Sequence, residues 1–242
     1  MHQTKVIPLL LGFCRLCDLL CAAAIPTKSE EANARLHPIG GNWGFIRATE
    51  ANPNLPRVLL IGDSIVGAYK DQVIAGLAGK ANVDVWTTGL HEGSQDLLPL
   101  LRTALANGPY AVVHFNIGLH GWPKGRIPEG QYEPLMRRYV ATLRTEAPTA
   151  RLIWASTTPV TVKGVPTNLD PGINPIIAAR NVIAAHIMQE NHIPVDDLNG
   201  LMADKLNLAA GDQFHWSQAG VEVQSQAVVA CILKNLPGSG RK

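Results

Sequence analysis

Short apolar runs alternate with longer segments of mixed polarity from residue 57 to the end of the chain. The apolar runs are mostly continuous, which is typical of strands that helices cover on both faces. They predict five parallel strands, at residues 58–61, 83–87, 111–116, 152–156 and 193–196. Repeated strand and helix units of this kind indicate an α/β fold around a parallel sheet.

The segments between these runs have the apolar spacing of helices. We expect helices at residues 66–78, 94–106, 132–146, 175–190 and 217–236. Leu135, Tyr139 and Leu143 recur on one face of the third helix, and Ser217 is placed to cap the last. Residues 163–175 are rich in turn formers, so we predict the longest loop there. Because ligands bind beyond the carboxyl ends of the strands in such sheets, we expect the site at that edge.

The first 24 residues have the pattern of a secretory signal peptide. Lys5 precedes an apolar run at residues 6–13, and three alanines at residues 22–24 follow. Arg15 and Asp18 favour the alternative of a buried or frayed N-terminal helix, because charges fit poorly in a signal. The apolar run is shorter than the roughly 20 residues that cross a bilayer, so we expect no membrane span. The pattern predicts a secreted or periplasmic protein.

The composition is that of one globular domain, with 46% hydrophobic and 17% charged residues in a chain of 242. We expect a leader at residues 1–24, an N-terminal extension at 25–56, the folded domain at 57–236 and a tail at 237–242. The net charge is +2, and the basic residues are scattered. They form no stripe that could follow a phosphate backbone, so we expect no nucleic-acid partner.

Cysteine placement argues against a disulfide framework. Three of the four cysteines lie in the predicted leader, which leaves Cys231 in the folded domain. The spacing of Cys14 and Cys17 lacks the strand and turn of a redox or zinc motif. Lipidation of Cys21 is a minor alternative, because Leu20 before it is bulkier than such processing prefers.

A candidate nucleophile follows the first predicted strand directly. The strand runs into Gly62-Asp63-Ser64, which puts Ser64 beyond its carboxyl end and near the start of a helix. A serine hydroxyl is a weak nucleophile, and it needs a base to take its proton and a carboxylate to orient that base. Gly62 to Gly67 contains no lysine of a P-loop, and no G-x-S-x-G elbow surrounds Ser64.

The base and the carboxylate are both found before the last helix. Asp212 stands three residues before His215, a separation that lets the carboxylate hydrogen-bond one ring nitrogen while the other faces Ser64. Taken alone, this pair would indicate a helix cap and a surface histidine. Together with Ser64 after the first strand, it predicts a catalytic triad.

Gly62-Asp63-Ser64 and Asp212-x-x-His215 resemble the first and last sequence blocks of the GDSL or SGNH hydrolase superfamily. The resemblance spans about residues 57–236. It implies a flavodoxin-like three-layer sandwich with helices on both faces of the sheet. It also implies hydrolysis of esters, thioesters or carbohydrate-linked acetyl groups by Ser64, His215 and Asp212, with no metal and no organic cofactor.

The same resemblance implies an oxyanion hole formed by Ser64, Gly89 and a residue after the third strand. The family has asparagine and then aspartate in that third block, where this chain has His120 and Gly121. A neutral imidazole can donate one N–H to an oxyanion as an amide does. Asn116 is the alternative donor.

For the substrate we expect a small acyl group, such as acetyl, on a saccharide. Asn116, Trp122 and Trp216 are candidate substrate-binding residues, with the tryptophans as stacking surfaces for a sugar ring. None of the remaining histidines of the predicted folded domain has the spacing of a metal site; they are His91, His114, His186 and His192.

Three other functions stay open on the sequence. One is a lipid acyl hydrolase or thioesterase. Another is a catalytically degenerate domain that binds glycans, suggested by the departure at His120 and Gly121. The third is a flavodoxin-like ligand-binding protein, which the lack of an acidic or phosphate-binding loop set disfavours. The oligomeric state stays open as well.

Overall fold

The computed structural model describes residues 44–48 and 52–237. The predicted leader and most of the predicted tail lie outside this range. The main sheet has six strands in the order β1-β3-β2-β4-β5-β8. Five of them are parallel to one another, namely β2 (Arg57–Gly62), β3 (Asn82–Thr87), β4 (Val112–Phe115), β5 (Arg151–Ala155) and β8 (Val195–Asp196). The five predicted parallel strands are therefore confirmed, in the order typical of flavodoxin-like folds.

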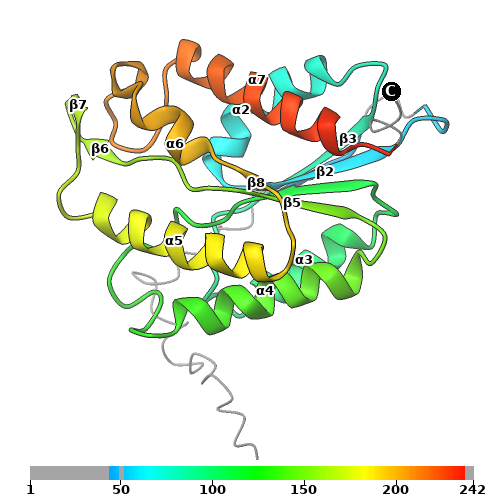
Figure 1. Ribbon diagram of the computed structural model, residues 1–242, viewed down its shortest axis with the longest axis horizontal. Helices are drawn as coiled ribbons and strands as arrows, with labels where there is room; N and C mark the ends of the chain where they lie inside the picture. The colour runs from blue at the N-terminus through cyan, green and yellow to red at the C-terminus, as the bar shows by residue number, and fades with distance from the viewer. Residues whose placement is uncertain (1–43, 49–51, 238–242) are drawn as a thin grey trace, which may run out of the picture.

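Helices cover both faces of this sheet, as Figure 1 shows. One face carries α2 (Ser64–Gly76), α6 (Leu198–Ala203) and α7 (Gln218–Asn235). The other carries α3 (Leu97–Leu105), α4 (Tyr132–Glu146) and α5 (Asn174–Glu190). Successive residues of a strand point to opposite faces, so Val58 and Leu60 of β2 enter one core while Leu59 and Ile61 enter the other. The predicted three-layer α/β fold is confirmed.

The sheet begins earlier than the sequence indicated. Strand β1 (Gly44–Ile46) pairs antiparallel with β3 and forms an edge of the sheet. This strand belongs to the segment that we assigned to an N-terminal extension before residue 57. It has three residues, and Ile46 is exposed, so it lacks the buried apolar run by which the inner strands were recognised.

The segment after β5 holds a hairpin where the sequence predicted a loop. Strands β6 (Thr161–Val162) and β7 (Val165–Leu169) pair antiparallel across a turn at Gly164, whose φ is +79°. A positive φ of this size suits glycine, which explains the residue at the turn. The predicted loop at 163–175 is therefore wrong over β7. The short helix α6 and the 3₁₀ turn at Leu206–Leu208 were not predicted either.

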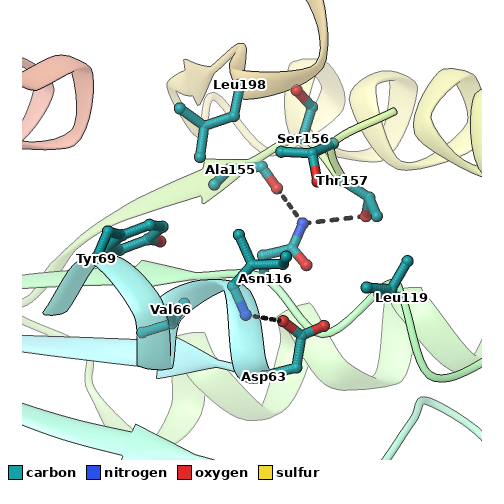
Figure 2. Close-up of a pocket in the computed structure, with 11 residues that line it drawn as sticks. Asp63, Val66, Tyr69, Asn116, Leu119, Ala155, Ser156, Thr157 and Leu198 are labelled. Carbon is teal, nitrogen blue, oxygen red and sulfur yellow. Dashed lines mark hydrogen bonds between the residues drawn. The ribbon is translucent and has the colours of Figure 1, made fainter. Parts of the chain in front are cut away.

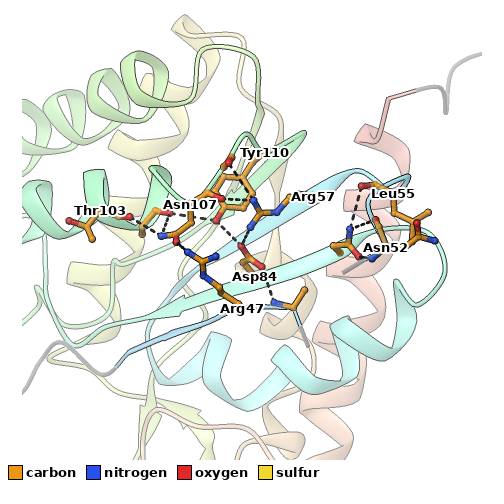
Figure 3. A network of polar contacts seen from close by, with 12 residues as sticks. Arg47, Asn52, Leu55, Arg57, Asp84, Thr103, Asn107 and Tyr110 are labelled. Carbon is orange, nitrogen blue, oxygen red and sulfur yellow. Dashed lines mark hydrogen bonds and ion pairs between the residues drawn. The ribbon is translucent and has the colours of Figure 1, made fainter. Parts of the chain in front are cut away.

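A network of polar contacts lies at the amino end of β2, whereas Ser64 follows the carboxyl end of this strand (Figure 3). Asp84 is buried and forms an ion pair with Arg57. It also accepts hydrogen bonds from the Tyr110 hydroxyl, at 2.8 Å, and from the backbone N–H of Ala48, at 2.9 Å. The network joins the chain before β2 to β3 and to the segment before β4. Its place indicates a structural role.

None of the helices in the described part of the chain is both long and apolar enough to cross a membrane.

Candidate active site

Ser64 is the first residue of α2, at the point where β2 ends. Asp63 caps the helix, because its Oδ1 accepts a hydrogen bond from the backbone N–H of Ile65 at 2.9 Å. Gly62 makes the tight passage from strand to helix feasible. A Cβ at this position would lie 2.1 Å from Cγ2 of Val66. Ser64 is thereby held at the carboxyl edge of the sheet, and it is partly exposed.

Asp212 and His215 lie on a tight loop just before α7. The backbone N–H of Ala210 donates to the carbonyl of His215 at 2.9 Å, which closes the loop. Oδ1 of Asp212 accepts from the backbone N–H groups of Phe214, at 3.1 Å, and His215, at 2.8 Å. The carboxylate therefore organises the loop as well as facing the imidazole.

The fold joins these two segments into a continuous hydrogen-bonded chain. Nε2 of His215 lies 2.8 Å from Oγ of Ser64, and Nδ1 of His215 lies 2.5 Å from Oδ2 of Asp212. Ser64 and His215 are 151 residues apart in sequence, and they meet because α2 and α7 pack side by side on one face of the sheet (Figure 1). The geometry is that of a nucleophile, a base and an orienting carboxylate.

The carboxylate end of this chain is open to solvent. The side chain of His215 is 39% exposed and that of Asp212 is 50% exposed. Desolvation is the largest single influence on the pKa of Asp212 and raises it, but hydrogen bonds from His215 and Phe214 together hold this pKa below its usual value. Asp212 is thus a carboxylate at neutral pH, and it can stabilise a protonated His215.

Asp63 lies behind Ser64, at a small internal cavity shown in Figure 2. Burial raises the pKa of Asp63, while the nearby His120 and His215 lower it. In the described part of the chain its Oδ2 has no hydrogen-bond partner. The cavity has a volume of about 10 Å³, which is close to the space of one water molecule. For Asp63, no role beyond its place in the motif was predicted from the sequence.

Gly89 follows the last residue of β3 by two positions. The backbone N–H of Thr88 donates to the carbonyl of Gly62 at 2.8 Å, which fixes the segment against the end of β2. Gly89 is buried, and within the described residues its own N–H makes no hydrogen bond. The N–H of Gly89 thus stays a candidate oxyanion donor at the carboxyl edge of the sheet.

His120 follows β4 and is electrostatically linked to the same site. Burial lowers the pKa of His120; the carboxyl group of Asp63 opposes this effect, while Arg126 and His215 add to it. The balance favours the neutral imidazole, which can still donate one N–H to an oxyanion. Nη1 of Arg126 donates to the carbonyl of His120 at 2.7 Å and fixes the loop.

Asn116 does not serve the site as the sequence suggested. Its Nδ2 donates to the carbonyl of Ala155 at 2.5 Å and to Oγ1 of Thr157 at 3.1 Å, as Figure 2 shows. Its Oδ1 accepts from the backbone N–H of Gly118 at 3.0 Å. Both donors of the amide are engaged, so Asn116 joins the ends of β4 and β5 and is withdrawn as an oxyanion donor and substrate-binding residue.

The two candidate tryptophans lie in different environments. Trp216 is 6% exposed and packs in the core beneath α7, which withdraws it as a stacking surface for substrate. Trp122 is partly exposed and stacks on Phe214, with ring centroids 6.2 Å apart and planes 30° apart. Phe214 was not predicted from the sequence as a site residue, although its place between Asp212 and His215 was a signal. The two rings form an aromatic wall beside His215.

No group of three or more His, Cys, Asp or Glu side chains is arranged to hold a metal ion in the described ranges 44–48 and 52–237.

Comparisons with known proteins agree on the fold. No protein-family model and no curated protein sequence matches the chain. A protein assigned as an arylesterase, from Agrobacterium tumefaciens, has a similar structure, with a TM-score of 0.62 and 19% identity over 75% of this chain and 100% of that chain. An acetyl xylan esterase from Geobacillus stearothermophilus has a TM-score of 0.60 and 16% identity over 77% of this chain and 95% of that one.

A lipase/acylhydrolase from Enterococcus faecalis is also similar, with a TM-score of 0.58 and 17% identity over 75% of this chain and 97% of that one. At these identities the comparisons establish the fold. The chain has the α/β architecture of these proteins, which is consistent with the resemblance of its first and last motifs to the GDSL or SGNH superfamily.

Proposed function

We propose that this protein is a serine ester hydrolase that works through an acyl-enzyme on Ser64. The observation that supports the proposal most directly is the hydrogen-bonded chain from Ser64 through His215 to Asp212, with distances of 2.8 Å and 2.5 Å. Core packing does not require three polar side chains in this arrangement at an exposed edge. Nucleophilic catalysis does.

The proposed reaction has two steps. Oγ of Ser64 attacks the ester carbonyl while its proton passes to Nε2 of His215, and Asp212 accepts the hydrogen bond from Nδ1. The protonated His215 then gives its proton to the leaving alcohol. In the second step His215 takes a proton from water, which attacks the acyl-enzyme and releases the acid. As the acyl–Oγ bond breaks, the protonated His215 returns its proton to Oγ of Ser64, which regenerates the serine.

The negative charge on the tetrahedral intermediate needs fixed donors. We assign this role to the backbone N–H groups of Ser64 and Gly89 and to the imidazole of His120. The first N–H groups of a helix have no intrahelical partner, so the N–H of Ser64 at the start of α2 is oriented for such a role.

A small acyl group on a carbohydrate is the substrate class that we favour. The triad is open to solvent, which suits a bulky alcohol and a short acyl chain. Trp122 and Phe214 offer an aromatic wall beside His215 on which a sugar ring could stack. The acetyl xylan esterase among the similar structures supports the same choice. The predicted leader would place the enzyme outside the cytoplasm, where acetylated polysaccharides are found.

A lipid acyl hydrolase or thioesterase is the second candidate. Its support is an apolar cluster that adjoins Trp122 and Phe214 and could hold a longer acyl chain; its buried members are Leu119, Val160, Ile173 and Ile177. Two assays distinguish the carbohydrate esterase from this second candidate. One measures acetate release from acetylated xylo-oligosaccharides, and the other measures hydrolysis of p-nitrophenyl octanoate. No acetate release together with rapid cleavage of octanoate would favour the second candidate.

The decisive variant is Ser64→Ala, assayed on p-nitrophenyl acetate. We expect kcat to fall on the order of 10⁴-fold or more, because the nucleophile is lost. A serine-reactive fluorophosphonate should label the wild type and leave this variant unlabelled. Ser225→Ala is the matched control, since the Ser225 hydroxyl hydrogen-bonds to Gln72 of α2 and to the carbonyl of Glu222 within α7. Equal inactivity of the wild type and Ser64→Ala, without labelling, would favour a glycan-binding domain instead.

His120 can be tested separately as an oxyanion donor. We expect His120→Ala to lower kcat on p-nitrophenyl acetate about 100-fold with little change in KM, because a donor to the transition state is lost. His120→Asn should recover part of this loss, since its amide also donates. Thermal unfolding of each variant controls for damage to the fold. An unchanged kcat in His120→Ala would remove His120 from the oxyanion hole.

A further inference from the structure

The β6–β7 hairpin is hydrogen-bonded to the loop that holds Asp212 and His215. The backbone N–H of Thr161 donates to the carbonyl of Gln213 at 3.0 Å, and that of Gly164 donates to the carbonyl of Gly211 at 2.9 Å. These two bonds fix the backbone on both sides of Asp212. The hairpin therefore supports the catalytic loop from outside the sheet.

Gln213 has an unusual backbone conformation within this loop. Its φ is +98°, in a region that residues other than glycine rarely adopt because it strains the backbone. Such a conformation persists only where surrounding contacts enforce it. The side chain supplies one of these contacts, because Nε2 of Gln213 donates to Oδ2 of Asp170 at 2.8 Å.

Asp170 is itself firmly held at the start of α5. Its Oδ1 accepts from the backbone N–H groups of Gly172, at 2.9 Å, and Ile173, at 2.8 Å. The backbone N–H of Asp170 donates to the carbonyl of Val160 at 2.9 Å. The pKa of Asp170 is lowered, chiefly by the hydrogen bond from the backbone N–H of Ile173. Desolvation opposes this effect, and the hydrogen bonds from Gly172 and Gln213 add to it. Asp170 thus offers Gln213 a fixed, charged acceptor.

We infer that Gln213 is a positioning residue whose bond to Asp170 holds His215 within reach of Ser64. The side chains of Asp212 and His215 are 50% and 39% exposed, so core packing restrains them weakly. The Gln213–Asp170 bond connects their loop to the start of α5, which packs on the sheet. Displacing a catalytic group by about 1 Å can cost on the order of 100-fold in rate, so this support matters for catalysis. The inference rests on the proposed esterase function.

An exchange of the two partners tests the inference. Gln213→Glu sets two carboxylates against each other, and we expect kcat on p-nitrophenyl acetate to fall about 10-fold or more, with KM changed less than about twofold. In Asp170→Asn alone, kcat should stay within about threefold of the wild-type value, because the Gln213 amide can turn its oxygen toward the new donor. The double variant, Gln213→Glu with Asp170→Asn, again has one donor and one acceptor in this pair. Its kcat should return to within about threefold of the wild-type value.

Two further measurements make the outcome decisive. Thr167→Glu adds the same charge on an exposed part of the hairpin and controls for electrostatics alone. The low-field proton resonance of the His215–Asp212 hydrogen bond, read by NMR, should broaden in Gln213→Glu and return in the double variant. The inference would be overturned if kcat of the double variant were as low as that of Gln213→Glu. It would also be overturned if kcat of Gln213→Glu equalled that of the wild type. Absence of wild-type esterase activity would refute the proposed function, while the resonance would still report on Gln213.

Discussion

Glu92 is a buried carboxyl group that the proposed reaction does not use. It is 5% exposed, and neither oxygen has a hydrogen-bond partner in the described part of the chain. A Cβ at Gly121 would lie 3.1 Å from Oε2 of Glu92 and 2.9 Å from Nη1 of Arg180. Glycine at position 121 therefore leaves room for these two side chains, which gives a physical reason for the residue that follows His120.

The ionisation of Glu92 predicts a pH-dependent stability. Burial raises its pKa from 4.5 to about 7, although Arg180 lowers it. Between these two pH values the folded protein keeps a proton that the unfolded chain has lost. The free energy of unfolding therefore falls as pH rises from about 4.5 to about 7, by up to roughly 3 kcal/mol, and stays level above this range.

Glu92→Gln should abolish this dependence and be more stable than the wild type at pH 8. Urea unfolding at pH 5 and pH 8 measures the effect, and the exposed Glu129→Gln is the control. The same change in unfolding free energy between these pH values in wild type and Glu92→Gln would refute the assignment.

At the scale of residues, the sequence could predict that Ser64, His215 and Asp212 meet, because each of them lies next to a local signal. Ser64 follows a buried apolar run, and Asp212 and His215 precede a capped helix. The bond between Gln213 and Asp170 has no such signal, because the two residues are 43 positions apart and lie on loops. Asn116 was misjudged for the same reason, since its partners come from the end of β5.

At the scale of elements, the strand-to-helix passage at α2 is the most constrained part of the site. A Cβ at Gly62 would lie 2.1 Å from Val66 Cγ2 and 3.0 Å from the carbonyl oxygen of Asn116. We expect Gly62→Ala to destabilise the fold by about 1–3 kcal/mol and to lower kcat at least about 10-fold, because Ser64 must move.

Gly67→Ala is the matched control for this prediction, inside the same helix. A Cβ at Gly67 would lie 4.0 Å from Cγ2 of Thr87, an ordinary contact. Alanine is the better helix former, so this variant should gain about 0.5–1 kcal/mol. Urea unfolding and steady-state kinetics compare the two. Equal effects of both substitutions would contradict the steric argument at Gly62.

The elements predicted from sequence are those with a strong local pattern. Helix α4 was placed at its observed bounds, because its buried residues recur with helical spacing. The inner strands are nearly continuous runs of buried residues. Strand β7 contains Pro166 and is mostly exposed, so its apolar pattern is weak and its pairing with β6 could not be read from the sequence. Elements stabilised by partners distant in the chain were missed.

At the scale of the whole molecule, the site lies where the strand order reverses. Ser64 follows β2, Gly89 follows β3, and His120 follows β4, and β2 is the strand that pairs with both of the others. The chain leaves β2 toward the face that carries α2, whereas it leaves β3 and β4 toward the face that carries α3 and α4. In open α/β sheets ligands bind at the carboxyl ends of the strands where this direction changes. The loop before α7 brings His215 to Ser64 at this point. Residues from both halves of the sequence thus complete one site.

Because one sheet supports both hydrophobic cores, we expect the domain to unfold as a single cooperative unit. Trp86 and Trp154 report on the core under α3, α4 and α5, and Trp216 reports on the core under α7. All three are at most 6% exposed. Urea unfolding of the wild type should give the same transition by tryptophan fluorescence and by far-UV circular dichroism. The same two signals should also coincide in Trp216→Phe, in which the fluorescence no longer reports on the core under α7. A fluorescence change of Trp216 at lower urea than the loss of helix would show instead that the layer carrying His215 opens first, as a separate unit.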